Sequence, residues 1–130
     1  MGVLDTSFLV DILRNAPRAV ELLVEIEGKE PTLLVAAPTV MELWEGALHS
    51  RAPEKEKAHI DALLASVNVL YLDVRAAKRA AELDFELSGK GTPLELQDIM
   101  IAAIAMANGE TVVTKDSDYA RIPGLKILKY

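Results

Sequence analysis

The residues LELQDIMIAAIAMANGETVVTKDSDYARI (94–122) are the part of the chain that best indicates its fold. From residue 99 to residue 107 nearly every side chain is apolar, which is typical of a helix buried on all sides. Asn108-Gly109 is a helix stop, and the apolar run that follows at 111–114 has the length of a buried strand. The stretch therefore predicts a helix from Pro93 to about Ala107 that leads into a strand of a covered sheet.

The same alternation of strand and helix runs through the rest of the chain. Further strands are predicted at Val3–Leu4, Leu33–Ala36, Val69–Leu72 and Lys126–Leu128. Further helices are predicted at Ser7–Arg14, Arg18–Glu27, Val40–Ser50, Glu54–Ser66 and Arg75–Ser88, with a short turn at Ser117–Ala120. Strands separated by helices imply right-handed crossovers and a parallel sheet that is covered on both faces. We expect one domain over residues 1–130, folded as a three-layer α/β/α sandwich.

Composition narrows the class of protein. The chain has 130 residues, of which 51% are hydrophobic and 26% charged, as in a globular domain. It contains no cysteine, which excludes a disulfide framework and a thiolate zinc site. Neither a signal-peptide pattern nor a membrane-length apolar run is present, so we expect a cytoplasmic protein with no membrane partner. The net charge of −6 argues against binding nucleic acid by bulk attraction, although two divalent ions would offset about four charges.

Acidic side chains occupy equivalent places in several of the predicted elements. Asp5 and Asp116 follow strands, and Glu42 and Asp98 lie in the first or second turn of helices. Asp118 comes close behind. Because these strands end and these helices begin at the carboxyl edge of a parallel sheet, the acids should share one rim. Acids gathered with little basic compensation are costly unless they hold cations, so the pattern predicts a divalent-metal site and metal-assisted phosphodiester chemistry.

Helix capping offers a second interpretation of three of these acids. Thr39-x-x-Glu42 has the spacing of a capping box. Asp5 and Asp116 could each cap the helix or turn that follows them. The sequence alone leaves both interpretations open for these three residues. The remaining mid-helix or wrongly placed acids are expected to be solvated: Asp11, Asp61, Asp73, Glu82, Asp84 and Glu86.

Asp98 is harder to explain as a cap. Thr92 and Glu95 already have capping-box spacing around Pro93, so the predicted helix does not need another cap. An aspartate on the inner face of a buried helix needs a cation or several hydrogen-bond donors. The functional interpretation is therefore favoured for Asp98.

Three segments together resemble the PIN domain and, within that family, the VapC-type toxins. They are VLDTSFLVDIL (3–13), TVMELWEG (39–46) and the stretch 94–122. The resemblance spans the chain in order and length. It implies a five-stranded parallel sheet of order 3-2-1-4-5, with the strands that end at Asp5 and Asp116 side by side.

The resemblance also implies roles for residues and partners. The residues implied to hold Mg²⁺ or Mn²⁺ are Asp5, Glu42, Asp98 and Asp116, with Asp118 at a position that is not always acidic in the family. Thr6 and Thr114 match hydroxyl positions that support the carboxylates. The implied activity is that of an RNA-cleaving toxin, held inactive by a co-expressed antitoxin and commonly assembled as a homodimer.

The expected chemistry is attack of a metal-activated water on the scissile phosphorus, which leaves 5′-phosphate and 3′-hydroxyl ends. Arg14, Lys90 and Lys115 are candidates for contacting the RNA backbone. Two alternatives remain, a Mg²⁺-dependent phosphatase or phospho-acceptor domain and a catalytically silent scaffold of the same fold. The apolar side chains expected to accept a partner helix are Phe8, Leu9, Ile12, Leu13 and Trp44.

Overall fold

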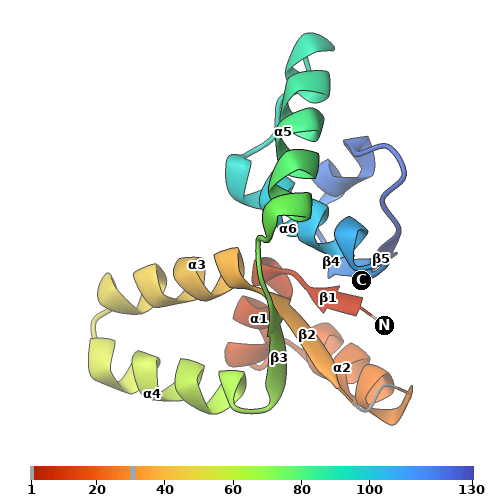
Figure 1. Ribbon diagram of the computed structural model, residues 1–130. Coiled ribbons are helices and arrows are strands. Elements are labelled where there is room, and N and C mark those ends of the chain that lie inside the picture. The colour runs from red at the N-terminus through yellow and green to blue at the C-terminus, as the bar shows by residue number, and fades with distance from the viewer. Residues whose placement is uncertain (1, 30–31) are drawn as a thin grey trace.

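In the described residues the chain forms five strands and six α-helices, with a pair of helices after each of the first three strands (Figure 1). The computed structural model describes residues 2–29 and 32–130. The strands are β1 Gly2–Leu4, β2 Leu33–Ala36, β3 Val67–Leu70, β4 Thr111–Thr114 and β5 Ile127–Lys129. The helices are α1 Thr6–Leu13, α2 Pro17–Lys29, α3 Ala37–Leu48, α4 Pro53–Leu64, α5 Val74–Gly89 and α6 Leu96–Ala107, with a 3₁₀ helix η1 at Ser117–Arg121. Within the described ranges, no helix is both long and apolar enough to cross a membrane.

The strands form one parallel sheet in the order β3-β2-β1-β4-β5. Val3 of β1 lies opposite Leu34 of β2 on one side and Val112 of β4 on the other. The predicted sheet order and fold class are confirmed. Because β1 and β4 are neighbours, the chain segments that leave their carboxyl ends begin side by side.

Alternate residues of the central strands point to opposite faces of the sheet, as the two-residue period of a strand requires. Leu4, Val35 and Val113 pack with the apolar sides of α1, α2, α3 and α4. Val3, Leu34 and Val112 pack with α5 and α6. Figure 1 shows α5 and α6 on one side of the sheet, and the two cores make the three predicted layers.

Two strand predictions are displaced from the observed bounds. β3 is Val67–Leu70 instead of Val69–Leu72, because pairing with β2 begins at Val67 opposite Leu33. Tyr71 and Leu72, at the end of this apolar run, are instead exposed. β5 begins one residue later than predicted, at Ile127.

The predicted start of α6 is wrong. The helix begins at Leu96, and Glu95 occupies the N-cap position without a side-chain capping bond. The Thr92 hydroxyl, which the capping-box interpretation requires at that helix, lies 3.3 Å from the Leu87 carbonyl oxygen and donates to the end of α5 instead. Asp98 therefore lies in the first turn of α6, nearer to the sheet edge than predicted.

Two of the side chains expected to accept a partner helix are unavailable. Phe8 and Leu9 are fully buried and contribute to the core under α1. Ile12, Leu13 and Trp44 are partly buried and pack at the border of the same core. The expectation is therefore wrong for Phe8 and Leu9, because the inner face of α1 is used by the sheet.

Gly2 provides a test of the close packing between β1 and β4. A Cβ at this position would lie 2.8 Å from Cγ2 of Val113, a buried β-branched side chain that has little freedom to move. We expect Gly2→Ala to lower the free energy of unfolding by about 1–3 kcal/mol, as overpacking does. The measurement is urea unfolding followed by circular dichroism.

Gly46 is the matched control, because it lies within α3 and a Cβ there meets no atom within 4 Å. Gly46→Ala should raise stability by up to about 1 kcal/mol through helix propensity. If Gly2→Ala were as well tolerated as Gly46→Ala, the tight β1–β4 contact would be contradicted.

Candidate metal centre

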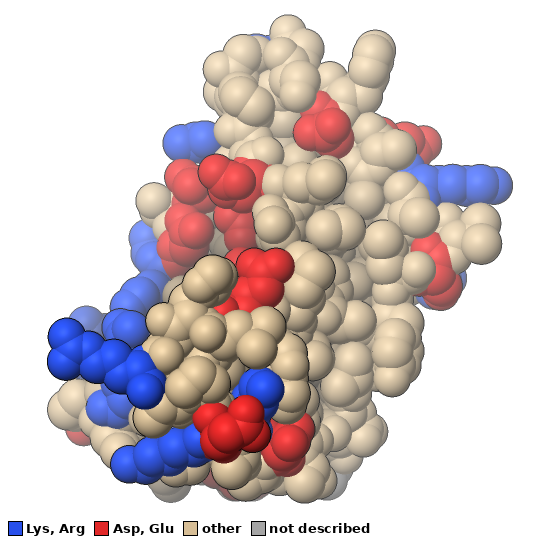
Figure 2. Space-filling view, turned by 90° about the vertical axis from the view of Figure 1, so that its left-hand side faces the viewer, with Lys and Arg blue, Asp and Glu red and all other residues tan. Residues whose placement is uncertain are grey.

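Four carboxylates lie where the sheet topology predicts, at the carboxyl edge. Asp5 directly follows β1 and Asp116 follows β4 after one intervening residue. Glu42 lies in the second turn of α3, and Asp98 in the first turn of α6. Figure 2 shows acidic side chains gathered around a hollow on one face of the molecule, with basic side chains to one side. We call Asp5, Glu42, Asp98 and Asp116 the acidic cluster.

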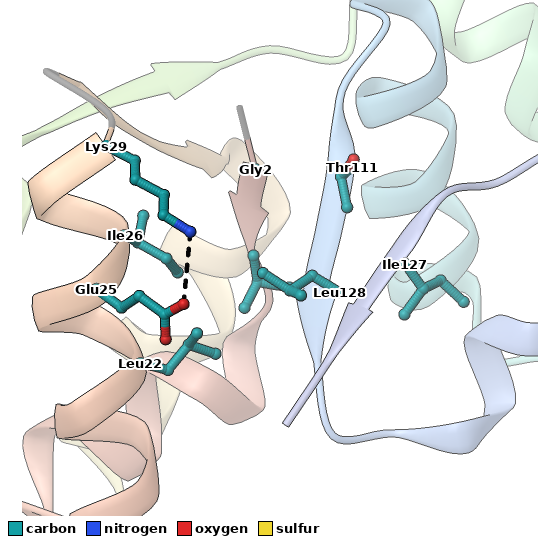
Figure 3. Close-up of a pocket in the computed structure, with 9 residues that line it drawn as sticks. Gly2, Leu22, Glu25, Ile26, Lys29, Thr111, Ile127 and Leu128 are labelled. Atoms are coloured by element: carbon teal, nitrogen blue, oxygen red, sulfur yellow. Dashed lines mark ion pairs between the residues drawn. The ribbon is translucent and has the colours of Figure 1, made fainter.

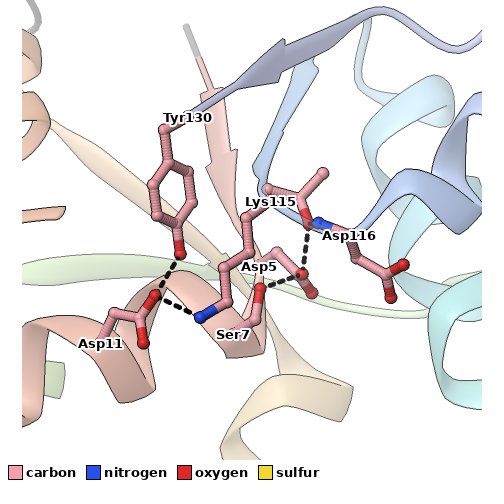
Figure 4. A network of polar contacts seen from close by, with 7 residues as sticks. Asp5, Ser7, Asp11, Lys115, Asp116 and Tyr130 are labelled. Atoms are coloured by element: carbon pink, nitrogen blue, oxygen red, sulfur yellow. Dashed lines mark hydrogen bonds and ion pairs between the residues drawn. The ribbon is translucent and has the colours of Figure 1, made fainter. Parts of the chain in front are cut away.

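Asp5 is the most buried member of the cluster, with 3% of its surface exposed. Its Oδ1 accepts hydrogen bonds from the Thr6 N–H at 2.7 Å and the Tyr119 hydroxyl at 2.9 Å. Its Oδ2 accepts from the hydroxyls of Ser7 at 2.9 Å and Thr114 at 2.7 Å (Figure 4). Asp5 is therefore the N-cap of α1, and its four hydrogen-bond donors in the described residues are all neutral.

Glu42 does not take part in a capping box. α3 begins at Ala37 after the N-cap Ala36, which makes no side-chain capping bond. Instead, Oε1 of Glu42 accepts from the Thr6 hydroxyl at 2.7 Å, and that hydroxyl also lies 3.1 Å from the Thr39 hydroxyl. The structure thus decides the open alternative for Glu42 against capping.

The cluster members repel one another. Burial, and then the charges of Asp5, Asp116 and Glu42, raise the pKa of Asp98 to about 6 against an opposing hydrogen bond from Tyr119. Burial also raises the pKa of Glu42, with Asp5 adding to the effect and the Thr6 hydroxyl opposing it. Both shifts have the sign expected for carboxylates that are partly buried beside other carboxylates.

The two acids after β4 have different surroundings. Asp116 caps η1, because its Oδ1 accepts from the Asp118 N–H at 2.9 Å, while its own N–H donates to the Thr114 hydroxyl oxygen at 2.9 Å. Asp118 is partly exposed and forms an ion pair with Arg121 at 3.1 Å. The capping interpretation of Asp116 is therefore correct, and the cap uses only one of its two carboxylate oxygens. Asp118 already has a basic partner.

Two residues that contact the cluster have no role in the sequence-based prediction. Tyr119 is completely buried, and its hydroxyl lies 2.9 Å from Asp5 and 3.2 Å from Asp98. Ser7 donates to Asp5. Both residues lie in the stretches quoted above, Ser7 in DTS (5–7) and Tyr119 in DSDY (116–119). Their hydroxyls lie next to the acids in the sequence, and this closeness is the feature from which their role could have been predicted.

Lys115 lies close to the cluster in sequence but is held by another acid. Its Nζ is 2.8 Å from Oδ2 of Asp11, which also accepts from the Tyr130 hydroxyl at 2.8 Å (Figure 4). These two hydrogen bonds lower the pKa of Asp11, the one from Lys115 most. The expectation that Asp11 is merely solvated is wrong. So is the same expectation for Asp73, which caps α5 by accepting from the Ala76 N–H at 2.8 Å.

The other two candidate RNA contacts differ in position. Arg14 is exposed at the end of α1 and lines a groove of about 350 Å³ that Glu42 also lines. Lys90 lies at the end of α5 and pairs with Glu86 of the same helix at 3.1 Å. The structure connects Arg14 with the cluster through this groove, and gives no such connection for Lys90.

The donor set of the cluster fits a hard divalent cation, because it consists of carboxylate oxygens. Among residues 2–29 and 32–130, no Lys or Arg forms an ion pair with a cluster member. In the same ranges, no three carboxylates or imidazoles converge as closely as a metal ion requires. Convergence on a cation would therefore need side-chain movement within the cluster.

A separate pocket of about 370 Å³ lies between α2 and the strands β4 and β5 (Figure 3). It is lined mainly by apolar side chains, with an ion pair between Glu25 and Lys29 at 3.5 Å on one wall. None of its lining residues belongs to the acidic cluster. The chemistry of the carboxyl edge therefore does not involve this pocket.

Comparison with known proteins places the chain in a family. The tRNA(fMet)-specific endonuclease VapC of Salmonella typhimurium is 32% identical over 96% of this chain and 94% of its own length, and that of Shigella flexneri 31% over 95% and 93%. A crystal structure of DNA-bound VapBC from Salmonella typhimurium matches with a TM-score of 0.90 at 32% identity, covering 99% of this chain and 98% of that chain. The PIN domain profile matches residues 2–125, and the chain therefore belongs to the PIN domain family.

Proposed function

We propose that this protein is a Mg²⁺- or Mn²⁺-dependent endoribonuclease and the toxin of a toxin–antitoxin pair. The observation that carries the proposal is the group of mutually repelling carboxylates at the carboxyl edge, where the pKa of Asp98 is raised to about 6. Several relatives in this family are named ribonucleases or endonucleases of the VapC type. We place the protein in the cytoplasm, where its RNA substrate would be.

Asp5, Glu42, Asp98 and Asp116 would hold the cation, with Asp118 as a further candidate that would first have to leave Arg121. A bound divalent cation would activate a water for attack on phosphorus and offset the charge of the phosphodiester. Asp5 would be the fixed member, because four donors hold its two oxygens. Thr6 and Thr114 orient Glu42 and Asp5 through their hydroxyls.

Asp98 is suited to handle the proton of the attacking water. Burial and the neighbouring carboxylates raise its pKa to about 6 in the cation-free cluster, and a bound cation would lower it, so that Asp98 would be ionised and able to accept a proton. It is also partly exposed, unlike Asp5, so water can reach it. Arg14 and Lys115 remain candidates for phosphate contacts, with Lys115 oriented by Asp11.

The names of two relatives make the initiator tRNA the first RNA to test. Single-stranded segments of a tRNA, such as its loops, would be accessible to a cluster on an open rim. Because the protein carries a net charge of −6, RNA should approach through the cation and the nearby basic side chains instead of by bulk attraction.

A cognate antitoxin is the proposed protein partner, since solved structures of similar chains are VapBC complexes. The groove shared by Arg14 and Glu42 is lined on its apolar side by Val10, Leu13 and Leu43. It fits a partner segment that buries apolar side chains and directs an arginine toward Glu42. Such an arginine would oppose metal binding electrostatically.

We further propose that two copies of this chain pair through α5. Val74 and Phe85 are 72% and 84% exposed on this helix, on the side opposite to the buried Ala76, Ala80, Leu83 and Leu87. The first half of α5 is basic and the second half acidic; the charged side chains are Arg75, Lys78, Arg79, Glu82, Asp84 and Glu86. An antiparallel pair of these helices would therefore place unlike charges opposite each other and cover both apolar side chains.

RNA cleavage is the first activity to test for the proposed function. Purified, antitoxin-free protein should cut initiator tRNA in Mg²⁺ or Mn²⁺ and not in EDTA, leaving 5′-phosphate and 3′-hydroxyl ends. Asp98→Asn should lower the rate at least about 100-fold, as loss of a general base does. Gel electrophoresis and end-group analysis of the products measure both effects.

Asp61→Asn is the control for the cleavage assay, because Asp61 is an exposed residue of α4 outside the cluster. Its activity should equal that of the wild type. Products with 2′,3′-cyclic phosphate ends would exclude the metal-activated water. Metal binding without cleavage of any RNA in a broad pool would instead favour the catalytically silent scaffold.

The second prediction concerns stability without metal. Because the folded state raises the pKa of Asp98 to about 6, the folded protein keeps this proton to higher pH than the unfolded chain. The stability contribution is thus present below about pH 4, where the unfolded carboxyl also holds its proton, and is lost as the pH rises through about 6. At pH 7.5 in EDTA, Asp98→Asn should be more stable than the wild type by about 1 kcal/mol, after allowance for solvent screening.

Saturating Mn²⁺ should reverse this order, because a ligand that binds the folded state stabilises it and the variant has lost a ligand. Thermal unfolding of both proteins at pH 4 and pH 7.5, each with EDTA and with Mn²⁺, measures the eight stabilities. Equal stability of both proteins at pH 7.5 in EDTA would contradict repulsion at Asp98.

The third prediction concerns the α5 surface. Phe85→Glu should raise the dimer dissociation constant at least tenfold, because it places a charge where an apolar anchor is expected. Light scattering across a concentration series measures the change. Val24→Glu, at a residue of α2 that is 66% exposed, is the control and should leave the mass unchanged. A monomeric wild type at all concentrations would exclude the dimer.

A further inference from the structure

The hydroxyl of Tyr119 lies between two members of the acidic cluster that come from different layers. Tyr119 belongs to η1, and its ring is completely buried in the core between the sheet and the α5–α6 layer. Its oxygen is 2.9 Å from Oδ1 of Asp5 and 3.2 Å from Oδ1 of Asp98. In the described part of the chain, no other side chain is hydrogen-bonded to both of these acids.

The two carboxylates depend on this hydroxyl to different degrees. Asp5 has three other donors, the Thr6 N–H and the hydroxyls of Ser7 and Thr114. Asp98 has no other side-chain donor among the described residues. A phenol carries one hydrogen, and rotation about its C–O bond can direct that hydrogen to either acceptor. Asp5 can therefore release it to Asp98 and still remain hydrogen-bonded.

A phenylalanine at this position would fill the same space in the core. The hydroxyl adds a polar group at a buried site, which is costly unless it finds a partner, and here it finds two. The hydroxyl therefore serves the hydrogen bonding of the two acids, and the packing of the ring does not require it. Asp5 follows β1, whereas Asp98 lies in the first turn of α6. Because the two residues belong to different elements, nothing within either element fixes the distance between them.

We propose that Tyr119 is a positioning residue that holds Asp5 and Asp98 at the separation from which both bind the cation. The proposal rests on the metal-dependent function proposed above. Without the hydroxyl, Asp98 is free to turn toward solvent and away from Asp5, since their charges repel. The cation then has to bring the two carboxylates together itself, and its affinity falls accordingly.

The test compares two variants that each remove one phenolic oxygen. In Tyr119→Phe the lost partners are Asp5 and Asp98, and in Tyr130→Phe the lost partner is Asp11, at 2.8 Å. Calorimetry should show a dissociation constant for Mn²⁺ that is about tenfold higher in Tyr119→Phe than in the wild type. A change of this size corresponds to the loss of one hydrogen bond to a charged group. Tyr130→Phe should stay within about twofold of the wild type, although both variants lose a hydrogen bond and melt at a lower temperature.

RNA cleavage supplies a second readout. The rate of Tyr119→Phe should fall at low Mn²⁺ and recover as Mn²⁺ is raised, since the residue positions ligands and does not touch the substrate. Unchanged Mn²⁺ affinity in Tyr119→Phe together with a lower melting temperature would overturn the proposal and leave the hydroxyl a purely structural role.

A measurement on the unmodified protein covers the case in which Tyr119→Phe does not fold. The buried Tyr119 hydroxyl proton should give a slowly exchanging NMR signal that shifts when Mg²⁺ is added. A signal that does not move while Mg²⁺ binds would overturn the positioning role. Failure of the wild type to bind Mg²⁺ or Mn²⁺ at all would instead overturn the metal-dependent function, so the two failures are distinguishable.

Discussion

Mutual repulsion among carboxylates is the constraint on which the carboxyl edge of this protein depends. The surroundings provide hydroxyls and a backbone N–H for Asp5, yet in the described residues no lysine or arginine pairs with the cluster. Neutral donors make the burial of Asp5 tolerable without cancelling its charge. Burial, together with the remaining charge of Asp5, raises the pKa of Asp98 to about 6. On the function proposed above, a site built in this way would be stable enough to fold and would still attract a cation.

The parallel sheet is what brings these charges together. Its order places β1 beside β4, so Asp5 and Asp116 leave neighbouring strands at one edge. α3 follows β2 and α6 precedes β4, so both helices begin at that same edge and direct Glu42 and Asp98 to it. Strands of three or four residues are long enough to form a stable sheet here, because α-helices bury both of its faces. The fold thus stabilises an arrangement of charges that no single element could hold.

The basic residues nearest to this cluster in the sequence pair with acids outside it. Lys115 adjoins Asp116 in sequence, but Asp11 holds its ammonium group, with Tyr130 on the same carboxylate oxygen. Arg121 pairs with Asp118, outside the cluster. This separation reconciles an acidic protein with an RNA substrate. In the proposed mechanism the cations needed at the scissile phosphate would come from solution, and basic side chains lie to one side of the hollow in Figure 2.

The sequence by itself determined the alternation of strand and helix, because apolar periodicity is a local property of the chain. It also determined the shared rim for the four acids, because the connections of a parallel sheet fix which ends of the elements meet. The sheet order came from the resemblance to the family. Tertiary structure decided what each acid does there. Glu42 meets Thr6 instead of capping its helix, Asp11 meets Lys115 and Tyr130, and Tyr119 bridges Asp5 and Asp98. Most of these contacts join residues separated by 36 to 119 positions in the chain. The distances between these atoms are set by how the layers pack against one another. The spacing of residues along the chain does not determine this packing.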